Sequence, residues 1–297
     1  MTKVVIDDKR RLFGRVKLAI PVIVGARIRK PTVIIATIWV AAMVFAAVFA
    51  DFLAPLDPNK QNLLALYKPP LTSGHLLGTD NLGRDVLSRM LHGATVSLSA
   101  ALIGTGTAAL IGIPLGLLAA FFRSYADLTL NFLTDAIMTV PSLILALGIV
   151  AVLGPGLANA MIAIGIVVSP SFYRLARAST LDVRNQTYIE ATISLGASTP
   201  RTILRHVLPN ILTPLVVQTA IVAGICIMAE ASLSYLGLGV QSPQASWGSM
   251  LSNAARDLQR GSYLIYIPGF AIIATVLALG AIGNWLRDVV ANRGDGK

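Results

Sequence analysis

Long runs without a single charged residue dominate this chain. A helix needs about 20 mostly apolar residues to cross a bilayer, and each run is at least that long. Only 13% of the 297 residues are charged and mean hydropathy is +0.73, whereas a soluble domain carries about 25% charged residues. These features exclude a soluble enzyme, a disordered chain and a collagen-like chain, and they predict an all-α integral membrane protein. The uncharged runs are Pro31–Ala50, Gly93–Phe122, Ala136–Tyr173, Val207–Ala229 and Ser262–Leu286.

One of these runs is too long for a single span. Within Ala136–Tyr173, the turn sequence Gly154-Pro155-Gly156 divides the run into two helices. The run that starts at Val207 continues through Glu230 to about Leu238. We therefore expect six transmembrane helices.

The distribution of basic residues predicts the orientation. The chain has 24 Lys and Arg against 14 Asp and Glu, a net charge of +10. If the N-terminus is inside, 18 basic residues fall on the cytoplasmic side and 6 on the outer side. Basic residues collect on the cytoplasmic side of spanning helices, so both termini are predicted to be cytoplasmic and the charge requires no nucleic-acid partner. The nine-residue run 18–26 is too short to span and is expected at the membrane interface; a cleaved signal peptide is the less favoured alternative.

The segment 174–206 is the largest predicted cytoplasmic loop between spans. A helix is expected over Thr187–Leu195, ending at Gly196 as a left-handed cap. A second helix is expected to start with Ser198 or Thr199 as N-cap and Pro200 in its first turn. This helical pair has too little apolar area for a core of its own, so it predicts a surface for a partner.

The same segment carries a family resemblance. Glu190-Ala191-Thr192, Gly196 and Leu208-Pro209 resemble the E-A-A-x3-G-x9-I-x-L-P pattern of ABC importer permeases, with Thr192 in place of the second Ala and His206 in place of Ile. In that family the loop docks into a groove on the ATPase subunit. The resemblance implies a set of ATPase-coupling residues: Glu190, Ala191, Thr192, Gly196, Arg201, Leu208 and Pro209.

Two further segments make the resemblance more specific. Leu77–Arg89, and Ala229–Gly239 with Ser246-Trp247-Gly248, closely resemble the C-type subunit of the dipeptide/oligopeptide (peptide/nickel) transport family. The resemblance covers residues 31–290 and implies a type I ABC importer permease fold in the bacterial inner membrane. Such a chain would form half of a translocation pore for short peptides. Similar sequences import nickel, glutathione, haem-like ligands or oligosaccharides, so the cargo stays open.

The resemblance also implies partners and a layout. The expected partners are a homologous second permease subunit, two ABC ATPase subunits, an external substrate-binding protein and membrane lipid. No cofactor, metal or catalytic residue is expected, because ATP would be bound by the ATPases and the chain has no Walker loop. The expected layout is a cytoplasmic tail at 1–30, a first span with an external segment at 31–92, a transmembrane domain at 93–290 and a cytoplasmic tail at 291–297.

The external segment has its own expected structure. The apolar spacing from Leu82 to Leu91 predicts an amphipathic helix over 79–91 lying on the outer membrane surface, with Asp85 and Arg89 weakly paired. A metal site built from His75, Asp80, Asp85 and His92 is a looser alternative. The family-motif residues of this segment are Gly78, Thr79, Asp80, Gly83, Arg84 and Asp85.

Glu230 is the one acid within an apolar stretch, and an intramembrane carboxylate is a functional candidate by default. Counted from Pro209 at about 1.5 Å per residue, it should lie near the outer interface. A role in a gate or in capping a helix is favoured over substrate contact. Ser97 and Ser99 are pore candidates, although close helix packing is the favoured explanation for these small residues and for Gly112-x3-Gly116.

Two other classes of protein are less favoured. A secondary transporter would need more intramembrane charge than Glu230 and Asp135. An intramembrane hydrolase would need a catalytic group at depth, whereas His75, His92 and His206 all lie in loops or at span ends. The lone Cys226 excludes an internal disulfide.

Overall fold

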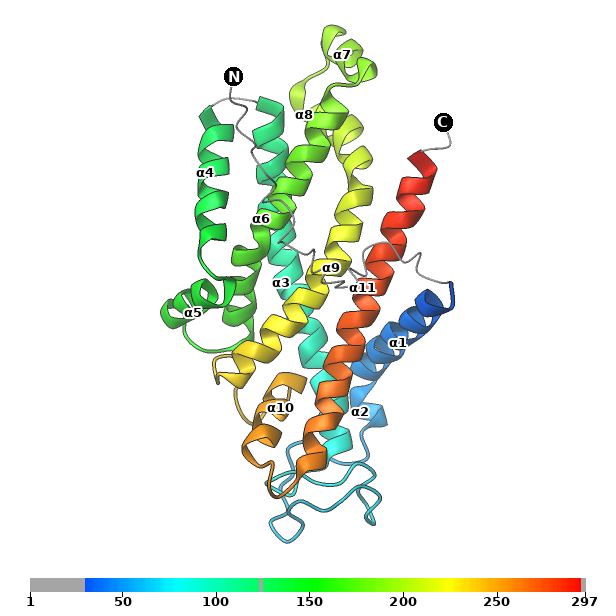
Figure 1. Ribbon diagram of the computed structural model, residues 1–297, viewed down its shortest axis with the longest axis vertical. Helices are drawn as coiled ribbons and strands as arrows, with labels where there is room; N and C mark the ends of the chain where they lie inside the picture. Colours follow the sequence, from blue (N-terminus) through cyan, green and yellow to red (C-terminus); the bar gives the residue numbers. More distant parts are fainter. Residues whose placement is uncertain (1–29, 123–124, 295–297) are drawn as a thin grey trace, which may run out of the picture.

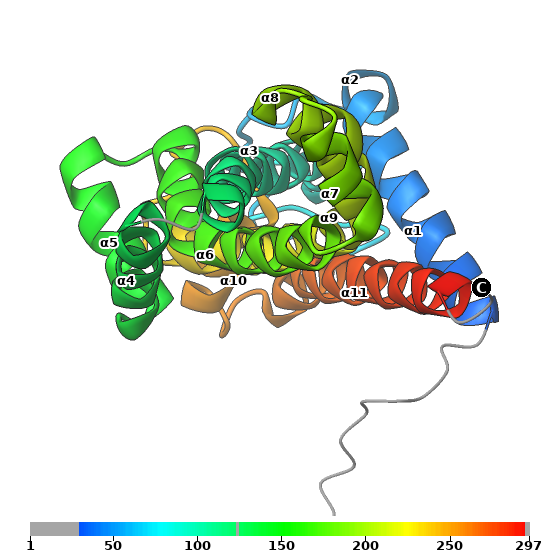
Figure 2. The ribbon, with the colours of Figure 1, turned by 90° about the horizontal axis from the view of Figure 1, so that it is seen from above.

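The computed structural model describes residues 30–122 and 125–294. Within these ranges the regular elements are all helical, and β-structure is confined to two isolated bridges. Figure 1 shows an elongated bundle with α7 at one end and α10 at the other, and Figure 2 shows the bundle from above. The helices are α1 (Lys30–Val48), α2 (Ala50–Leu53), α3 (Val86–Phe122), α4 (Tyr125–Thr139), α5 (Ser142–Leu153), α6 (Leu157–Arg184), α7 (Thr187–Ser194), α8 (Thr199–Thr202), the π-helix η1 (Ile203–Val207), α9 (Leu208–Tyr235), α10 (Trp247–Arg256), the 3-10 helix η2 (Ser262–Ile265) and α11 (Tyr266–Gly294).

Among the described residues, five helical segments are long and apolar enough to span a membrane, and the bent pair α4–α5 gives a sixth if it is counted as one span. This agrees with the predicted all-α membrane fold. The predicted spans that begin at Pro31, Val207 and Ser262 correspond to α1, α9 and α11. α11 continues to Gly294, beyond the predicted span end at Leu286. The predicted N-terminal tail, apart from Lys30, and residues 295–297 lie outside the described part of the chain.

The third predicted span is not the straight helix expected from Ala136 onward. The apolar residues are divided between α4 and α5, which meet at an angle of 98°. The break falls before Pro141, since a proline disfavours helical geometry in the residue that precedes it. The helical segment also begins earlier than predicted, at Tyr125.

The predicted amphipathic helix over 79–91 is wrong in its first half. Residues 79–85 form a turn closed by an isolated bridge between Thr79 and Asp85, and α3 begins only at Val86. The Asp80 carboxylate holds this turn by accepting the backbone N–H groups of Leu82 (2.9 Å) and Arg84 (3.0 Å). An Asp side chain that binds nearby backbone donors competes with helix formation. From Val86 the chain enters one continuous helix of 37 residues.

The α3–α6 interface is the most extensive in the bundle. A Cβ atom at Gly112 would lie 2.5 Å from the Ser169 carbonyl oxygen, and one at Gly116 would lie 2.5 Å from that of Tyr173. Small residues allow helix backbones to approach in a membrane, where apolar burial gives little driving force between helices. The expected packing role of the Gly112-x3-Gly116 pair is confirmed.

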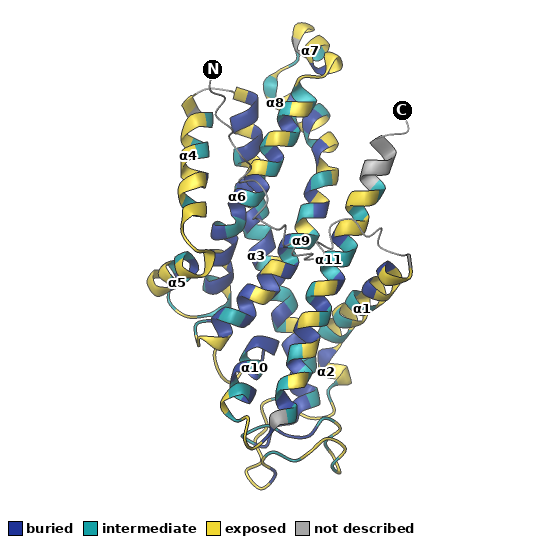
Figure 3. Ribbon diagram, in the orientation of Figure 1, coloured by how far each residue is buried: buried dark blue, intermediate teal, exposed yellow. Residues whose placement is uncertain are grey.

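Burial follows this arrangement. The centre of the bundle, formed by α3, α6 and α9, is buried, whereas α1, α4 and α5 expose most of their surface (Figure 3). The exposed residues of α1 are large and apolar, with Ile34, Ile35 and Ile38 each about 60% exposed. Such faces suit lipid or another membrane subunit.

Two alanine substitutions in α3 test the α3–α6 contact. Gly112→Ala should lower the free energy of unfolding by about 1–3 kcal/mol, because its methyl group overlaps the α6 backbone. Gly106→Ala should be neutral or stabilising by up to about 1 kcal/mol, since a Cβ there meets no atom within 4 Å. Thermal unfolding of the purified variants in detergent measures both. Equal effects at the two positions would contradict this account of the packing.

Candidate functional site

Most of the predicted coupling residues lie beside or at the start of one continuous helical segment, and Glu230 lies near its end. α8, η1 and α9 together run from Thr199 to Tyr235, 37 residues, which at about 1.5 Å per residue extend roughly 55 Å. That exceeds the hydrocarbon thickness of about 30 Å, so the segment reaches beyond the bilayer. α9 packs against α3, α6, α10 and α11 and lies at the centre of the bundle (Figure 1).

At one end, α7 projects from the bundle as a separate short helix (Figure 1). Ile189 is fully buried in the main apolar core, and the Tyr188 hydroxyl accepts a hydrogen bond from Asn210 Nδ2 (3.2 Å) in the first turn of α9. These contacts fix α7 to the start of α9. Glu190 and Ala191 remain exposed on its outer side.

The turn after α7 has the predicted form. α7 ends at Ser194 and Gly196 adopts a φ of +83°, the left-handed conformation in which glycine carries no steric cost. Space around Gly196 is open, because a Cβ there would meet no atom within 4 Å. The backbone conformation therefore accounts for the glycine.

The remaining coupling residues line the entry to α9. α8 has Ser198 at its N-cap position with Pro200 in the first turn, as expected, although the Ser198 side chain makes no capping bond. Arg201 and Pro209 are exposed and Leu208 is half-buried. The π-helix η1 lies between α8 and α9. Nothing in the sequence indicates it, and π-helical turns are frequent at functional sites.

Thr192, which replaces an alanine of the family pattern, directs its hydroxyl back into its own helix. Its Oγ1 donates to the Tyr188 carbonyl oxygen (2.7 Å). The extra polar atom is thereby satisfied inside α7. The threonine hydroxyl therefore adds no unpaired donor to the exposed surface formed by Glu190 and Ala191.

At the other end of the segment, Glu230 is only 1% exposed, in the last two turns of α9. The Ser234 hydroxyl donates to its Oε1 (2.7 Å) and the Ser97 hydroxyl of α3 donates to its Oε2 (3.4 Å). A buried polar group is costly unless it is hydrogen-bonded. Two helices thus supply the donors that this carboxyl group needs.

The same two hydroxyls hold the chain that follows α9. The Trp247 backbone N–H donates to Ser97 Oγ (3.2 Å), and the Val240 N–H donates to Ser234 Oγ (3.3 Å). The Trp247 indole N–H donates to the Met90 carbonyl oxygen of α3 (3.1 Å). We call Glu230, Ser97, Ser234 and Trp247 the Glu230 cluster; it fastens the loop 236–246 and α10 to α3 and α9.

Two members of this cluster, Glu230 and Ser97, are candidates from the sequence alone. Ser234 and Trp247 stand out there only as parts of motifs. The i,i+4 spacing of Glu230 and Ser234 was the available signal. Ser99 lies outside the cluster, because its hydroxyl donates to the Val96 carbonyl oxygen of its own helix (2.8 Å).

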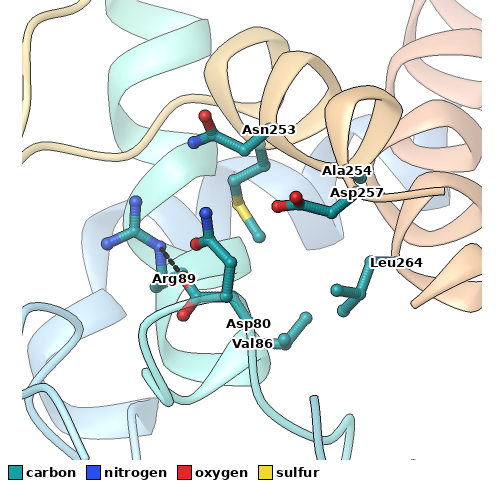
Figure 4. Close-up of a pocket in the computed structure, with 9 residues that line it drawn as sticks. Asp80, Val86, Arg89, Asn253, Ala254, Asp257 and Leu264 are labelled. Atoms are coloured by element: carbon teal, nitrogen blue, oxygen red, sulfur yellow. Dashed lines mark ion pairs between the residues drawn. The ribbon is translucent and has the colours of Figure 1, made fainter. Parts of the chain in front are cut away.

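The external motif residues form an ionic cluster beside α10. Asp80 Oδ2 accepts Arg84 Nε at 2.7 Å and lies 3.5 Å from Arg89 Nε, and both arginines are at least 96% buried. Figure 4 shows the Asp80–Arg89 pair facing Asn253 and Asp257. The predicted Asp85–Arg89 pair is wrong: Asp85 instead accepts the Ser88 N–H and hydroxyl, each at 2.9 Å.

The residues of the looser metal alternative do not converge. His75 Nδ1 lies 2.9 Å from Asp85 Oδ1, while His92 Nε2 lies 3.0 Å from Asp51 Oδ1. Asp80 is held by the two arginines. In the described residues no three His, Cys, Asp or Glu side chains approach one another closely enough to hold a metal ion.

Gly78, Thr79 and Gly83 shape the chain around the ionic cluster. Thr79 is fully buried, and its N–H donates to the Lys68 carbonyl oxygen (3.0 Å). Gly78 and Gly83 have φ values of +78° and +69°, and the backbones of Lys68 and Asn62 occupy the space that a side chain would need. Glycine is required at both positions.

Two serine-to-alanine variants in α3 test the Glu230 cluster. Ser97→Ala removes a donor to Glu230 and the acceptor of the Trp247 N–H, so it should destabilise the protein by about 1–3 kcal/mol and alter Trp247 fluorescence. Ser99→Ala, two residues away, should change stability by less than about 0.5 kcal/mol. Thermal unfolding in detergent separates them; a destabilised Ser99→Ala beside a normal Ser97→Ala would refute the assignment.

Comparison with known proteins assigns the family. The family model for the inner membrane component of binding-protein-dependent transport systems matches residues 112–294, and that for the N-terminal TM domain of oligopeptide transport permease C matches residues 28–70. The chain is 43% identical over 253 residues to a di/tripeptide transport system permease protein, DppC, of Pseudomonas aeruginosa, covering 84% of each chain. It is 37% identical to a glutathione transport system permease protein, GsiD, of Pectobacterium atrosepticum, covering 89% of this chain and 87% of that protein.

Solved structures agree on the fold. The chain is similar to a chain of the inward-facing MetNI methionine ABC transporter, with a TM-score of 0.55 at 18% identity, covering 67% of this chain and 95% of that one. The predicted type I ABC importer permease fold is confirmed by this likeness. The chain therefore belongs to the family of inner membrane components of binding-protein-dependent transport systems, the non-catalytic permease subunits of bacterial ABC importers.

Proposed function

We propose that this permease forms half of the pore of an ATP-driven importer of short peptides, and that α7 couples it to the ATPase. The observation that carries the proposal is the continuous segment from Thr199 to Tyr235. It begins at an exposed helical pair and ends at the buried Glu230 cluster. An element of this kind can transmit a displacement from one side of the membrane to the other.

The proposed orientation places α7 and both termini in the cytoplasm. The segment 174–206 carries five basic residues, part of the 18 that fall on this side. Basic residues near span ends are retained on the cytoplasmic side. The ionic cluster of Asp80, Arg84 and Arg89 then faces outward.

The surface of α7 and the turn after it suits a protein partner. Leu195 is 87% exposed and Tyr188 is 44% exposed, beside the exposed carboxylate of Glu190. Apolar and aromatic side chains exposed next to charges on a projecting element are typical of an interaction surface. An ATPase subunit would dock here. A homologous permease, a second ATPase and an external substrate-binding protein would complete the complex.

In the proposed mechanism, ATP binding brings the two ATPases together and displaces α7 and α8. Because α8, η1 and α9 are continuous, the displacement reaches the far end of α9. The Glu230 cluster would then move with loop 236–246 and α10 as an external gate. Glu230 acts in this scheme by holding the gate elements together.

Short peptides are the proposed cargo because the relatives at 35–43% identity include several permeases named for dipeptides or di/tripeptides. Glutathione is the second candidate, favoured by the relative from Pectobacterium atrosepticum. Both cargoes are small molecules with peptide bonds and free carboxylates.

Reconstitution tests the function. Proteoliposomes holding both permeases and both ATPases should take up radiolabelled dialanine only when the binding protein and ATP are supplied on opposite sides. Uptake should stop when the ATPases are omitted. Uptake by the permeases alone, driven by an ion gradient, would indicate a secondary transporter and contradict the proposal.

Substitutions at Gly196 test the coupling turn. Gly196→Val should abolish ATP-driven uptake, because a β-branched residue is strongly disfavoured at φ +83°. Gly196→Asn should keep substantial uptake, since Asn tolerates this conformation. Membrane-inserted amounts of both proteins should match the wild type, because the space around Gly196 is open. Normal uptake by Gly196→Val would overturn the coupling role.

A further inference from the structure

A polar cavity of about 240 Å³ lies at the α10 end of the molecule. Its walls come from the turn 79–85, the start of α3, the loop 236–246 and α10. It adjoins the smaller cavity drawn in Figure 4, with which it shares Asn81, Arg89 and Asn253. The residues that give it its chemistry are Arg84, Arg89, Arg256, Asn81, Gln244 and Asn253.

Positive charge exceeds negative charge at this cavity. Arg84 and Arg89 share the single carboxylate of Asp80. Among the described residues, the hydrogen-bond partner of Arg256, at the rim, is the neutral Ser252 (3.4 Å). The carboxylate of the nearby Asp85 is hydrogen-bonded to His75 and Ser88. Asp257 belongs to the smaller cavity. A buried cationic group requires a compensating anion.

The guanidinium of Arg84 also has unused donors. It is only 4% exposed, and within the described residues its one hydrogen bond runs from Nε to Asp80. The two terminal nitrogens, which form the planar fork of a guanidinium, are left for a ligand. Asn81 Oδ1 is buried at the same wall and has no hydrogen-bond partner in the part of the chain that the structure describes. This oxygen is placed to accept a hydrogen bond from an amide N–H of a ligand.

We propose that this cavity binds the carboxylate of a short peptide on the outer side of the membrane. This inference rests on the proposed function. A guanidinium fork binds a carboxylate through two parallel hydrogen bonds, and arginine is better suited to this than lysine. A concave site with a few fixed polar groups is typical of small ligands, whereas stable protein interfaces are broad, about 800 Å² on each partner.

The site adjoins the proposed gate. Ser234 lines the cavity and its hydroxyl also donates to Glu230. A carboxylate held at Arg84 therefore lies beside the residue that fastens loop 236–246 to α9. Occupancy of the cavity would be sensed by the Glu230 cluster.

The test uses dialanine and dialanine amide, which differ only in the carboxylate. Their binding is measured by saturation-transfer NMR on the complete permease–ATPase complex in nanodiscs, without the binding protein. Dialanine should bind at least about tenfold more tightly than the amide. Arg84→Lys should remove most of this preference, and Arg256→Gln, at the exposed rim, should reduce it several-fold. Lys60→Gln removes an exposed external charge that does not line the cavity and should leave the preference intact.

Several results would overturn the inference. Equal binding of dialanine and its amide would do so, as would a preference unchanged in both arginine variants. If instead Arg256→Gln weakened attachment of the binding protein and left dialanine binding untouched, the cavity would receive an acidic side chain of that protein. Failure of the proposed function would look different, because the wild-type complex would then take up no peptide with ATP and binding protein present.

Discussion

Glu230 imposes the constraint around which one end of the structure is arranged. The residue is only 1% exposed, so the carboxyl oxygens must find hydrogen-bond donors within the protein. Ser234 supplies one from the next turn of α9, and Ser97 supplies the other from α3. Because the same hydroxyls accept from Val240 and Trp247, satisfying one acid also fixes the loop and helix that close this end of the bundle.

The constraint extends to the opposite end through α9. The Glu230 cluster holds the last turns of that helix against α3, and α3 in turn packs against α6 through glycines that leave no room for a side chain. At the first turn of α9, Asn210 and Tyr188 connect it to α7. Packed helices have discrete arrangements and do not deform continuously. A displacement of α7 is therefore expected to move α9 as a rigid body.

The spans and the α7 turn could be predicted because local signals determine them. Uncharged runs mark helices in a membrane, and glycine at a helix end marks a left-handed residue such as Gly196. The failures arose where another interaction competed with the apolar pattern. Asp80 accepts backbone N–H groups and prevents a helix before Val86. Pro141 interrupts the helix that the apolar pattern alone would continue from α4 into α5. The partners of Glu230 depend on how α3, α9 and α10 come together, which no spacing within one helix specifies.

The proposed coupling requires that α7, α8, η1 and α9 move as one rigid element. Spin labels at two exposed positions, Leu195 in the turn between α7 and α8 and Leu236 directly after α9, measure this in the assembled complex by pulsed electron spin resonance. We expect the same distance between the two labels in the nucleotide-free and ATP-trapped states, while the distance from Leu236 to the second permease changes. A shift of about 5 Å between Leu195 and Leu236, one helical turn, with the distance to the second permease unchanged, would contradict it.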